Sequence, residues 1–334
     1  MARGTVYNNI VSEEKWNAVN KDNKELLTEW LVYLTSVDRS HETISQYQND
    51  IRICFVWMLE NANNKFFIDI NKRDIMKFQN WMLTELKLSS GRIRRLKSTV
   101  SSLSNYIVNV LDDVYPDFKN IVNKIPAPVN EPVREKTVLA DEEVEKVLQE
   151  LFENKKYQLA CVLALAAYSG SRKSELLRFK VSYFKDEYIK NGLYSTPEKI
   201  KTKGRGSAGK KLTRFVLAAP FKPYFDKWME ERKAKGIPDD IDDLFVVYQN
   251  EQWNPMRVST LDNWTESLTK MFGKDFYFHC LRHYFCTSLY RANIPAEIIK
   301  EVIGWQSVEM VSTYTDIEAS EEFDKYFDDD GIKK

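Results

Sequence analysis

Residues 277–316 gather side chains suited to chemistry on phosphate. The segment reads YFHCLRHYFCTSLYRANIPAEIIKEVIGWQSVEMVSTYTD and holds two of the three histidines in the chain. His279 and Arg282 are three residues apart, and Tyr314 follows Trp305 by nine residues. Packing in a core accounts for the leucines and isoleucines of this segment but not for these four residues. One arginine side chain can bind two phosphate oxygens at once, and a tyrosine hydroxyl can act as a nucleophile.

Two earlier stretches carry further cations. "YSGSRKSELLRF" contains Arg172 with Glu175 three residues later, and "EKIKTKGRGSAGKK" contains Lys201 and Lys203 among turn-forming glycines. Taken singly, each of these residues has an ordinary structural explanation. An isolated Tyr314 is most often a half-buried aromatic residue and Trp305 a core residue. Only their joint order and spacing point to a site.

The elements that must position these side chains are mainly helical. Before "KIPAPVNEPVREKTVL", four segments carry apolar residues at three- and four-residue spacing, which predicts a bundle of about four helices. The prolines of that stretch predict an extended interdomain linker. Beyond it, "ADEEVEKVLQELF" predicts an amphipathic helix, and "YQLACVLALAAYSG" a helix buried all round that ends at Gly170.

A change of pattern over residues 181–217 predicts a small antiparallel sheet, because short Ile-, Tyr-, Val- and Thr-rich segments alternate with glycines. Helices return from Lys222, including one with Pro295 in its first turn that ends at Gly304. The expected fold class is therefore mainly α with a small antiparallel β-sheet. The expected domains are an N-terminal extension (1–22), a helical domain (23–124), a linker (125–137), a catalytic domain (138–316) and a C-terminal tail helix (317–334).

Composition restricts the class of protein. The 334 residues are 43% hydrophobic, enough for two cores, and lack both a run of roughly 20 apolar residues and a secretory signal, so we expect a cytoplasmic protein associated with the nucleoid and no membrane partner. The four cysteines lack CxxC spacing and predict buried free thiols. The net charge is zero, but the tail from Asp316 has eight acidic residues against three lysines, which leaves an excess of positive charge elsewhere.

Three short segments that follow the predicted helical domain resemble, in this order, the motifs of the tyrosine recombinases, the integrase group of phages and mobile elements. "YSGSRKSELLRF" looks like the first-arginine box, "HCLRH" is the His-x-x-Arg-His box, and "IGWQSVEMVSTYTD" resembles the block that ends in the nucleophilic tyrosine. The resemblance covers roughly residues 23–327. It departs from the common pattern at Trp305, where most of the family has histidine.

The resemblance implies a catalytic role for each matching residue. Arg172 and Arg282 would clamp the scissile phosphate, and Tyr314 would attack it to give a 3′-phosphotyrosyl bond, with neither metal nor other cofactor required. His279 would bind the phosphate or assist proton transfer, and Trp305 would donate its indole N–H. The leaving-group acid would be a lysine on a β-hairpin. We favour Lys203, which directly precedes a glycine, while Lys201 in a Lys-Thr pair stays open.

In the family, helices of the first domain lie in the major groove, and the two domains form a clamp round DNA. The corresponding candidates for DNA contact are basic or polar residues at two helix starts, with Lys201 in addition: Thr43, Gln46, Arg92, Arg94, Arg95 and Lys97. A solvated helix face is the plain alternative for each of them. The family often docks its last helix into a neighbouring protomer, and Phe323, Tyr326 and Phe327 form an apolar stripe that suits this.

The function that the resemblance implies is site-specific DNA recombination, integrating or excising a mobile element through a Holliday junction. The partners would be double-stranded DNA with a specific site and three further copies of the chain, and an accessory DNA-bending protein stays open. Two alternatives share the fold, namely a type IB topoisomerase and a DNA-binding module without catalysis. A covalent protein–DNA adduct would exclude the second, and strand exchange between two duplexes would exclude the first.

Overall fold

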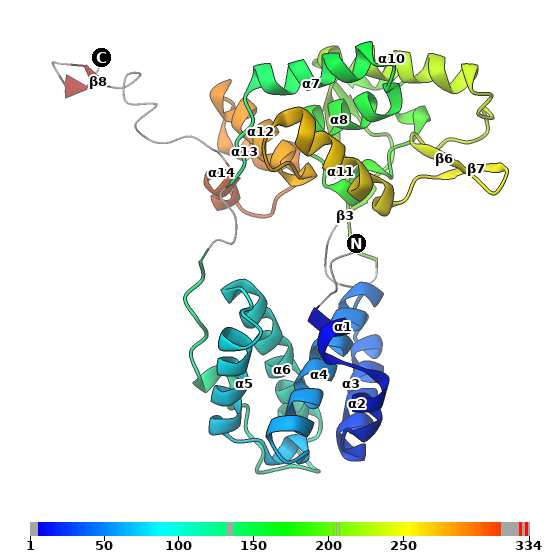
Figure 1. Ribbon diagram of the computed structural model, residues 1–334. Coiled ribbons are helices and arrows are strands. Elements are labelled where there is room, and N and C mark those ends of the chain that lie inside the picture. Colours follow the sequence, from blue (N-terminus) through cyan, green and yellow to red (C-terminus); the bar gives the residue numbers. More distant parts are fainter. Residues whose placement is uncertain are drawn as a thin grey trace. The chain divides into compact units, whose positions relative to one another are not determined.

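The computed structural model describes residues 6–131, 136–202, 204, 206 and 208–314, and the backbone of 327–328 and 331–332. The chain divides into two compact units, one made largely of residues 1–135 and the other largely of residues 136–334 (Figure 1). The linker predicted from the prolines falls at this division.

The N-terminal unit is all helical in its described part. The four predicted helices are α3 (Lys21–Ser36), α4 (His41–Asn61), α5 (Lys72–Thr84) and α6 (Ser90–Val110). Two short helices precede them, α1 (Val6–Ile10) and α2 (Glu13–Ala18), and both pack on α4. Ile10 and Val19 are buried in the core of this unit. The residues expected to be an extension therefore contribute to the first core.

Local sequence signals explain where these helices begin. Ser40 and Ser89 accept hydrogen bonds from the backbone N–H groups three residues on, and Asn71 forms a reciprocal capping box with Asp74. The apolar faces then meet around Trp30, Trp57 and other fully buried side chains. Burial of such large side chains, each worth about 1.5–3 kcal/mol, holds the bundle together.

The start of the predicted linker is bound to the N-terminal unit. Gln79 Nε2 donates to Pro126 O at 3.0 Å, and Lys97 Nζ donates to Ile125 O at 2.6 Å. Arg94 Nε donates to Pro128 O at 2.9 Å. These bonds satisfy carbonyl groups of a proline-rich segment that cannot form a regular ladder. The extended path expected from the prolines is therefore fixed against α5 and α6.

The C-terminal unit is built round a central helix. The helices are α7 (Asp141–Glu153), α8 (Tyr157–Ser169), α9 (Lys173–Leu176), α10 (Ala218–Ala234), α11 (Val258–Phe272), α12 (Phe278–Arg291), α13 (Ala296–Ile303) and α14 (Glu309–Tyr314). Helix α8 is buried on nearly every side and contacts α7, α10 and α12 (Figure 1). It ends at Gly170, which has a left-handed φ of 57°, as the sequence predicts.

Short antiparallel strands flank these helices, and they confirm the predicted fold class. One sheet has the order β1 (Ile189–Lys190), β2 (Leu193–Ser195) and β5 (Phe215–Leu217), and a separate hairpin joins β3 (Ile200–Thr202) to β4 (Lys210–Leu212). A further hairpin, β6 (Val246–Gln249) with β7 (Gln252–Pro255), lies outside the predicted range. Near the C-terminus, β8 (Phe327–Asp328) pairs with β9 (Gly331–Ile332).

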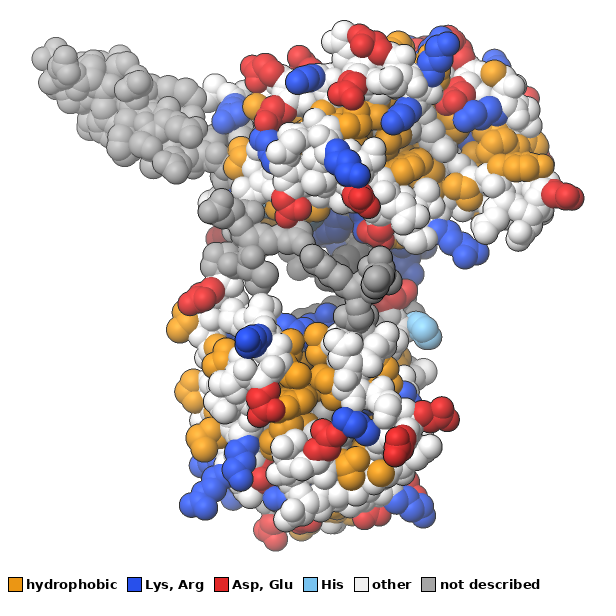
Figure 2. Space-filling view, viewed as in Figure 1, with side chains coloured by type: hydrophobic (Ala, Val, Ile, Leu, Met, Phe, Trp, Pro, Cys, Tyr) orange, Lys and Arg blue, Asp and Glu red, His pale blue; other side chains and the backbone are white. Residues whose placement is uncertain are grey.

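The surface and the cysteines fit the composition. All four cysteines are buried and free, as predicted. Among the described helices, none combines the length and the apolar character that crossing a bilayer would require. Figure 2 shows Lys and Arg side chains mixed with Asp and Glu side chains over the visible face of each unit. This mixture matches the net charge of zero.

Candidate active site

Tyr314 is the last residue of α14 and faces two histidines of α12. Its hydroxyl lies 2.9 Å from Nε2 of His279. The His283 ring stacks on the Tyr314 ring, with centroids 4.4 Å apart and an interplanar angle of 17°. The Trp305 ring also packs against Tyr314, with the two ring centroids 4.7 Å apart. The structure thus brings together the predicted nucleophile, His279 and Trp305.

Helix α12 presents His279, Arg282 and His283 from one region because residues three and four apart share a helix face. Arg282 is fully buried, and its Nη1 and Nη2 donate to Gly170 O at 2.7 Å and Ile303 O at 3.2 Å. Its guanidinium lies over the Trp305 ring at 5.3 Å. Within the described part of the chain, Arg282 Nε and Trp305 Nε1 are buried donors without an acceptor.

Arg172 stands at the start of α9, just after the sharp turn that ends α8. Its Nη1 and its backbone N both donate to the carboxylate of Glu175, at 2.8 and 3.2 Å. The Glu175 side chain is fully buried, whereas that of Arg172 is 30% exposed. A Cβ on Gly170 would lie 2.6 Å from Phe285 of α12, so only glycine allows this turn to approach α12 so closely. Glu175 therefore orients Arg172 and also accepts a hydrogen bond from its backbone.

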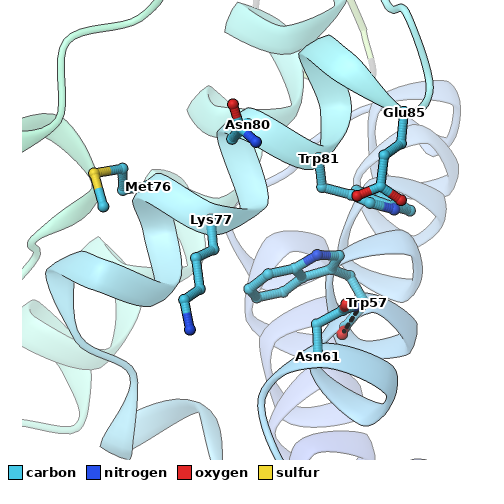
Figure 3. Close-up of a pocket in the computed structure, with 7 residues that line it drawn as sticks. All are labelled: Trp57, Asn61, Met76, Lys77, Asn80, Trp81 and Glu85. Atoms are coloured by element: carbon cyan, nitrogen blue, oxygen red, sulfur yellow. Dashed lines mark hydrogen bonds between the residues drawn. The ribbon is translucent and has the colours of Figure 1, made fainter.

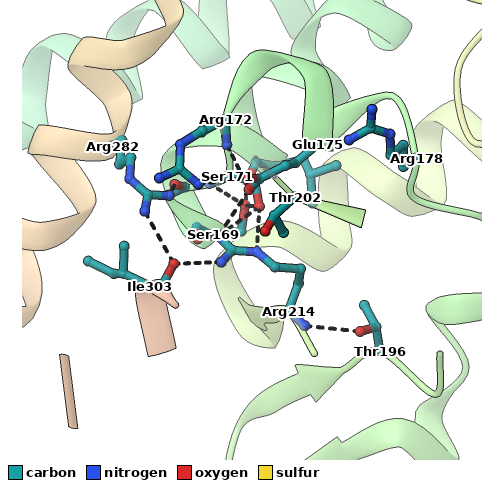
Figure 4. A network of polar contacts seen from close by, with 12 residues as sticks. Ser169, Ser171, Arg172, Glu175, Arg178, Thr196, Thr202, Arg214, Arg282 and Ile303 are labelled. Carbon is teal, nitrogen blue, oxygen red and sulfur yellow. Dashed lines mark hydrogen bonds and ion pairs between the residues drawn. The ribbon is translucent and has the colours of Figure 1, made fainter. Parts of the chain in front are cut away.

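A third arginine, Arg214, belongs to this cluster and was not predicted. It precedes β5 and is fully buried between the Ser169–Arg172 turn and the end of α13 (Figure 4). Its Nη2 lies 3.7 Å from Glu175 Oε2. In the sequence it reads as one basic residue before a short apolar strand. No spacing signal connects it to the boxes, because its contacts are all distant along the chain.

Burial and mutual repulsion shift the pKa values of this cluster. Burial first, and then the charges of His283, Arg282 and Arg172, lower the pKa of His279 to about 4. His279 is therefore neutral at physiological pH, and its Nε2 can accept a hydrogen bond from the Tyr314 phenol when its proton is on Nδ1. Burial, with Arg172 and Arg214, lowers the pKa of Arg282 to about 9, which leaves it charged.

Glu175 is the acidic member of the cluster. Burial by itself would raise the pKa of its carboxyl group, but Arg214 first and Arg172 second hold that pKa below its usual range. The carboxylate therefore stays ionised beside three guanidinium groups. The cluster carries an excess of positive charge, which favours binding of an anion.

A pocket of about 390 Å³ opens beside these cations. It is lined by Arg172, Lys173, Ser174, Tyr277 and His279, together with residues of α11. Lys173 forms an ion pair with Asp262 on α11. The pocket therefore offers one oriented arginine, one further cation and a neutral imidazole to a phosphate group.

One of the two candidate lysines, Lys201, is on the β3–β4 hairpin. Lys201 is exposed in β3 and pairs in register with Lys211 of β4. Its backbone carbonyl accepts a hydrogen bond from Arg178 Nη1 at 2.6 Å. Lys203 lies outside the described residues, as does the stripe-forming part of the predicted tail helix before Phe327. The described tail backbone, Phe327–Asp328 and Gly331–Ile332, is a pair of strands, so the predicted tail helix is wrong for these residues.

The candidate DNA-contacting residues of the N-terminal unit differ in their surroundings. Gln46, Arg94 and Arg95 are exposed, and the hydroxyl of Thr43 lies 3.0 Å from that of Ser40.

The other two candidates, Arg92 and Lys97, are less exposed and bind groups inside the unit. Arg92 Nη2 forms an ion pair with the buried Asp50 at 2.7 Å. Lys97 is buried, and besides Ile125 O its ammonium group binds Gln79 Oε1 at 2.5 Å. As placed, Lys97 is a link between α6, α5 and the linker.

A larger pocket, of about 490 Å³, is found in the N-terminal unit between α4 and α5. Trp57 and Trp81 line it with Lys77 and Glu85 (Figure 3). Its lining lacks the combination of a nucleophile with several cations that surrounds Tyr314. The candidate active site is therefore the cluster in the C-terminal unit.

The C-terminal unit thus has His279, Trp305 and Arg282 round Tyr314, with Arg172 beside His279. The profile of the phage integrase family matches residues 137–321, more than half of the chain. The chain belongs to that family, and it is a tyrosine site-specific recombinase.

Curated relatives and solved structures agree with this assignment. The chain is 29% identical over 225 residues to the SPbeta prophage-derived recombinase-like protein YomM of Bacillus subtilis strain 168, and this covers 66% of each chain, just under two thirds of the relative. It is 23% identical over 300 residues to a tyrosine recombinase of Thermosipho africanus, which covers 87% of this chain and 95% of that one.

The fold has close counterparts among solved structures. A XerH site-specific recombinase bound to palindromic difH matches with a TM-score of 0.62 and 19% identity, over 85% of this chain and 78% of that chain. A lambda integrase tetramer bound to a Holliday junction matches with a TM-score of 0.62 and 17% identity, over 88% and 77% of the two chains. These similarities show the fold.

Proposed function

We propose that this recombinase cuts and rejoins DNA through a 3′-phosphotyrosyl bond on Tyr314, and thereby integrates or excises a mobile element. The observation that carries the proposal is the 2.9 Å contact between the Tyr314 hydroxyl and a histidine that is neutral at physiological pH. A neutral imidazole can take the phenol proton as the oxygen attacks phosphorus. The Tyr314 hydroxyl has both a histidine and the arginine cluster beside it.

The scissile phosphate would bind beside Arg172, in the pocket that this residue shares with His279. Arg172 is held by Glu175 through one nitrogen, Nη1, so the other side of its guanidinium can face a phosphate oxygen. Buried Arg282 Nε and Trp305 Nε1 are donors that lack a protein acceptor in the described residues. Donors arranged before the substrate arrives stabilise the charge that develops on the non-bridging oxygens.

A lysine of the β3–β4 hairpin would protonate the leaving 5′ oxygen, with Lys203 favoured and Lys201 the alternative. The attack exchanges a DNA phosphodiester for a phosphotyrosyl diester, so one ester bond forms as one breaks. Attack by a 5′ hydroxyl then reverses the step, returns the proton and frees Tyr314. Because the bond energy is conserved, rejoining needs no nucleotide cofactor.

The complete reaction requires two duplexes and four active sites. We propose that four copies act together, with the acidic C-terminal tail of each copy docked on its neighbour. The apolar side chains of Phe323, Tyr326 and Phe327 would supply the contact. A lambda integrase with a similar fold is known as a tetramer on a Holliday junction, which supports this assembly. The division into a core-binding domain and a catalytic domain at residues 125–137 is proposed on the same basis.

The test begins with finding the DNA site. The protein is incubated with randomised nicked duplexes, DNA that stays attached in detergent is recovered and sequenced, and the DNA flanking the gene is searched for the same sequence. We expect a discrete site, a protein–DNA adduct on it, and exchange of strands between two duplexes that carry it. Relaxation of supercoils without strand exchange would indicate a topoisomerase instead. Binding without an adduct would leave a DNA-binding module.

A further inference from the structure

Arg214 connects the two chain segments that carry the reacting groups. Its Nη1 donates to Ile303 O at 2.6 Å, at the end of α13. Its Nη2 donates to Ser171 Oγ at 3.2 Å and to Ser169 O at 3.4 Å, in the turn before Arg172. Its own backbone N–H donates to Thr196 Oγ1 at 3.0 Å. The Arg214 side chain thus connects the turn before Arg172, at Ser169–Ser171, with the end of α13 at Ile303, which leads to Trp305 (Figure 4).

Arg282, which belongs to α12, connects the same two parts of the chain. It donates to Gly170 O in the first turn and shares the Ile303 carbonyl with Arg214. The two arginines therefore fix one turn against the other through a common acceptor. Loss of Arg214 leaves Ile303 O with only the longer, 3.2 Å bond.

Arg214 helps to explain why a glycine, Gly304, follows α13. Gly304 has a φ of +79°, and a Cβ there would lie 3.0 Å from Arg214 Nη1 and 2.7 Å from Leu212 Cδ1. A larger residue would be strained in this conformation and would displace the guanidinium. The backbone turn that leads to Trp305 therefore allows the close approach of Arg214 only because residue 304 is glycine.

Charge gives Arg214 a second role. The groups that face the Glu175 carboxylate are Arg172 from the start of α9, Arg214 from the strand side and Arg282 from α12. Within 4 Å, Glu175 has ion pairs only with Arg172 and Arg214 in the described chain. Glu175 holds Arg172 in place only while it is ionised, because a protonated carboxyl group is a poor partner for a guanidinium.

We propose that Arg214 is a positioning residue for the strand-transfer reaction, which fixes the Trp305 turn against the Arg172 turn and keeps Glu175 able to hold Arg172. The inference rests on the proposed function, since it concerns the same site. Arg214 touches no reacting atom. Its effect reaches the phosphate through Glu175 and Arg172, and it reaches Tyr314 through Ile303, Gly304 and Trp305.

The first experiment measures single-turnover adduct formation on the duplex recovered above, as a function of pH. Arg214→Met is expected to react about 10²-fold more slowly, the usual effect of a small misplacement of reacting groups, while it binds the duplex like the wild type. The acid limb of its pH–rate profile should move to higher pH, because Glu175 has lost one of the two arginines that hold its pKa down. Arg214→Lys keeps the charge but not the planar fork, so it should be slow with the acid limb of the wild type.

The matched control is the same pair of substitutions in a Glu175→Gln background. In that background, Arg214→Met should have the same acid limb as Glu175→Gln alone. This result would also show that the shift of the acid limb comes from Glu175 and not from His279. A wild-type rate in Arg214→Met, or a slow rate with an unmoved acid limb, would overturn the proposal. The double variant removes both members of the Arg214–Glu175 ion pair, so neither is left buried without the other, which keeps the test available should Arg214→Met fail to fold.

A second readout needs no DNA. Urea unfolding of the full chain is followed at several pH values for the wild type, Arg214→Met, Glu175→Gln and the double variant. Arg214→Met should be less stable than the wild type near neutral pH, and this deficit should shrink as acid protonates Glu175, because Arg214 helps to hold the pKa of that carboxyl group below its usual range. In the Glu175→Gln background the deficit caused by Arg214→Met should not change with pH. A deficit that still changes with pH there contradicts the coupling. Failure of the wild type to form any adduct would instead count against the proposed function.

Discussion

The hydroxyl of Tyr314 and Nε2 of His279 lie 2.9 Å apart, although 35 residues separate them along the chain. Three further side chains, His283, Trp305 and Arg282, surround this pair. The contact places a proton acceptor on the nucleophile before any substrate is bound.

Tyr314→Phe should bind the recombination site like the wild type and form no covalent adduct, because the substitution removes only the attacking oxygen. The ring keeps its stacking with His283. Gel separation in detergent detects the adduct, and a mobility shift measures binding. An adduct in the Phe variant would move the role of nucleophile to Tyr290 or Tyr326.

His279 should titrate near pH 4. Burial disfavours its charged form, so the unfolded chain takes up a proton at about pH 6.5 while the native protein does not. Stability from this group is therefore complete above pH 6.5 and is lost as the pH falls toward 4. Proton NMR can follow the ring directly, since the chain has three histidines. His279→Gln should remove this titration and flatten the loss of stability, whereas His41→Gln should change neither. A midpoint for His279 near 6.5 would contradict the buried, neutral histidine.

Lys203→Ala should slow cleavage by about 10²- to 10⁴-fold if Lys203 is the general acid. A substrate with sulfur at the bridging 5′ position needs little protonation to leave, so its cleavage should be largely restored in this variant. Lys201→Ala should show a smaller defect without rescue, and Arg172→Ala should not be rescued either, because Arg172 acts on the non-bridging oxygens. Rescue of the Lys201 variant alone would reverse the assignment. Rescue of neither would make His279 the first suspect.

Arg95→Ala and Lys97→Met should affect different properties, although both residues are in the same basic stretch. Arg95 is exposed, so its loss should lower the slope of log affinity against log salt by about 1 if it contacts a phosphate. Lys97 is buried against Gln79 and Ile125, so its loss should cost about 1–3 kcal/mol of stability and leave that slope unchanged. A lower salt slope in Lys97→Met would show that its ammonium group turns toward DNA.

Truncation after Ala319 should weaken assembly on DNA and strand exchange more than it weakens binding of one protomer to a half-site. The deleted part contains the apolar stripe, and exchange of Phe323, Tyr326 and Phe327 for alanine is the matched test within the full-length chain. Analytical ultracentrifugation on DNA that carries the site measures assembly. Unchanged synapsis in both variants would exclude docking of the tail on a neighbour.

The helices, the division into two units and the boxes could be predicted from the sequence because each depends on local patterns. Apolar spacing predicts which faces are buried, Gly170 and Gly304 end helices in the left-handed conformation, and prolines mark the linker. Likewise, the order of Arg172, His279, Arg282, Trp305 and Tyr314 identifies the chemistry. These properties depend on residue type and spacing, which the sequence contains in full.

Tertiary structure alone decided the partners of the charged side chains. Lys97 and Arg94 are in one basic stretch and both bind the linker start, yet Lys97 is buried and Arg94 is exposed. Arg214 has no local feature that distinguishes it from a surface arginine, and its burial beside Glu175 results from the meeting of three distant segments. The free energy of a charge depends on its surroundings in space, because burial and nearby charges set it, and no one-dimensional pattern records those surroundings.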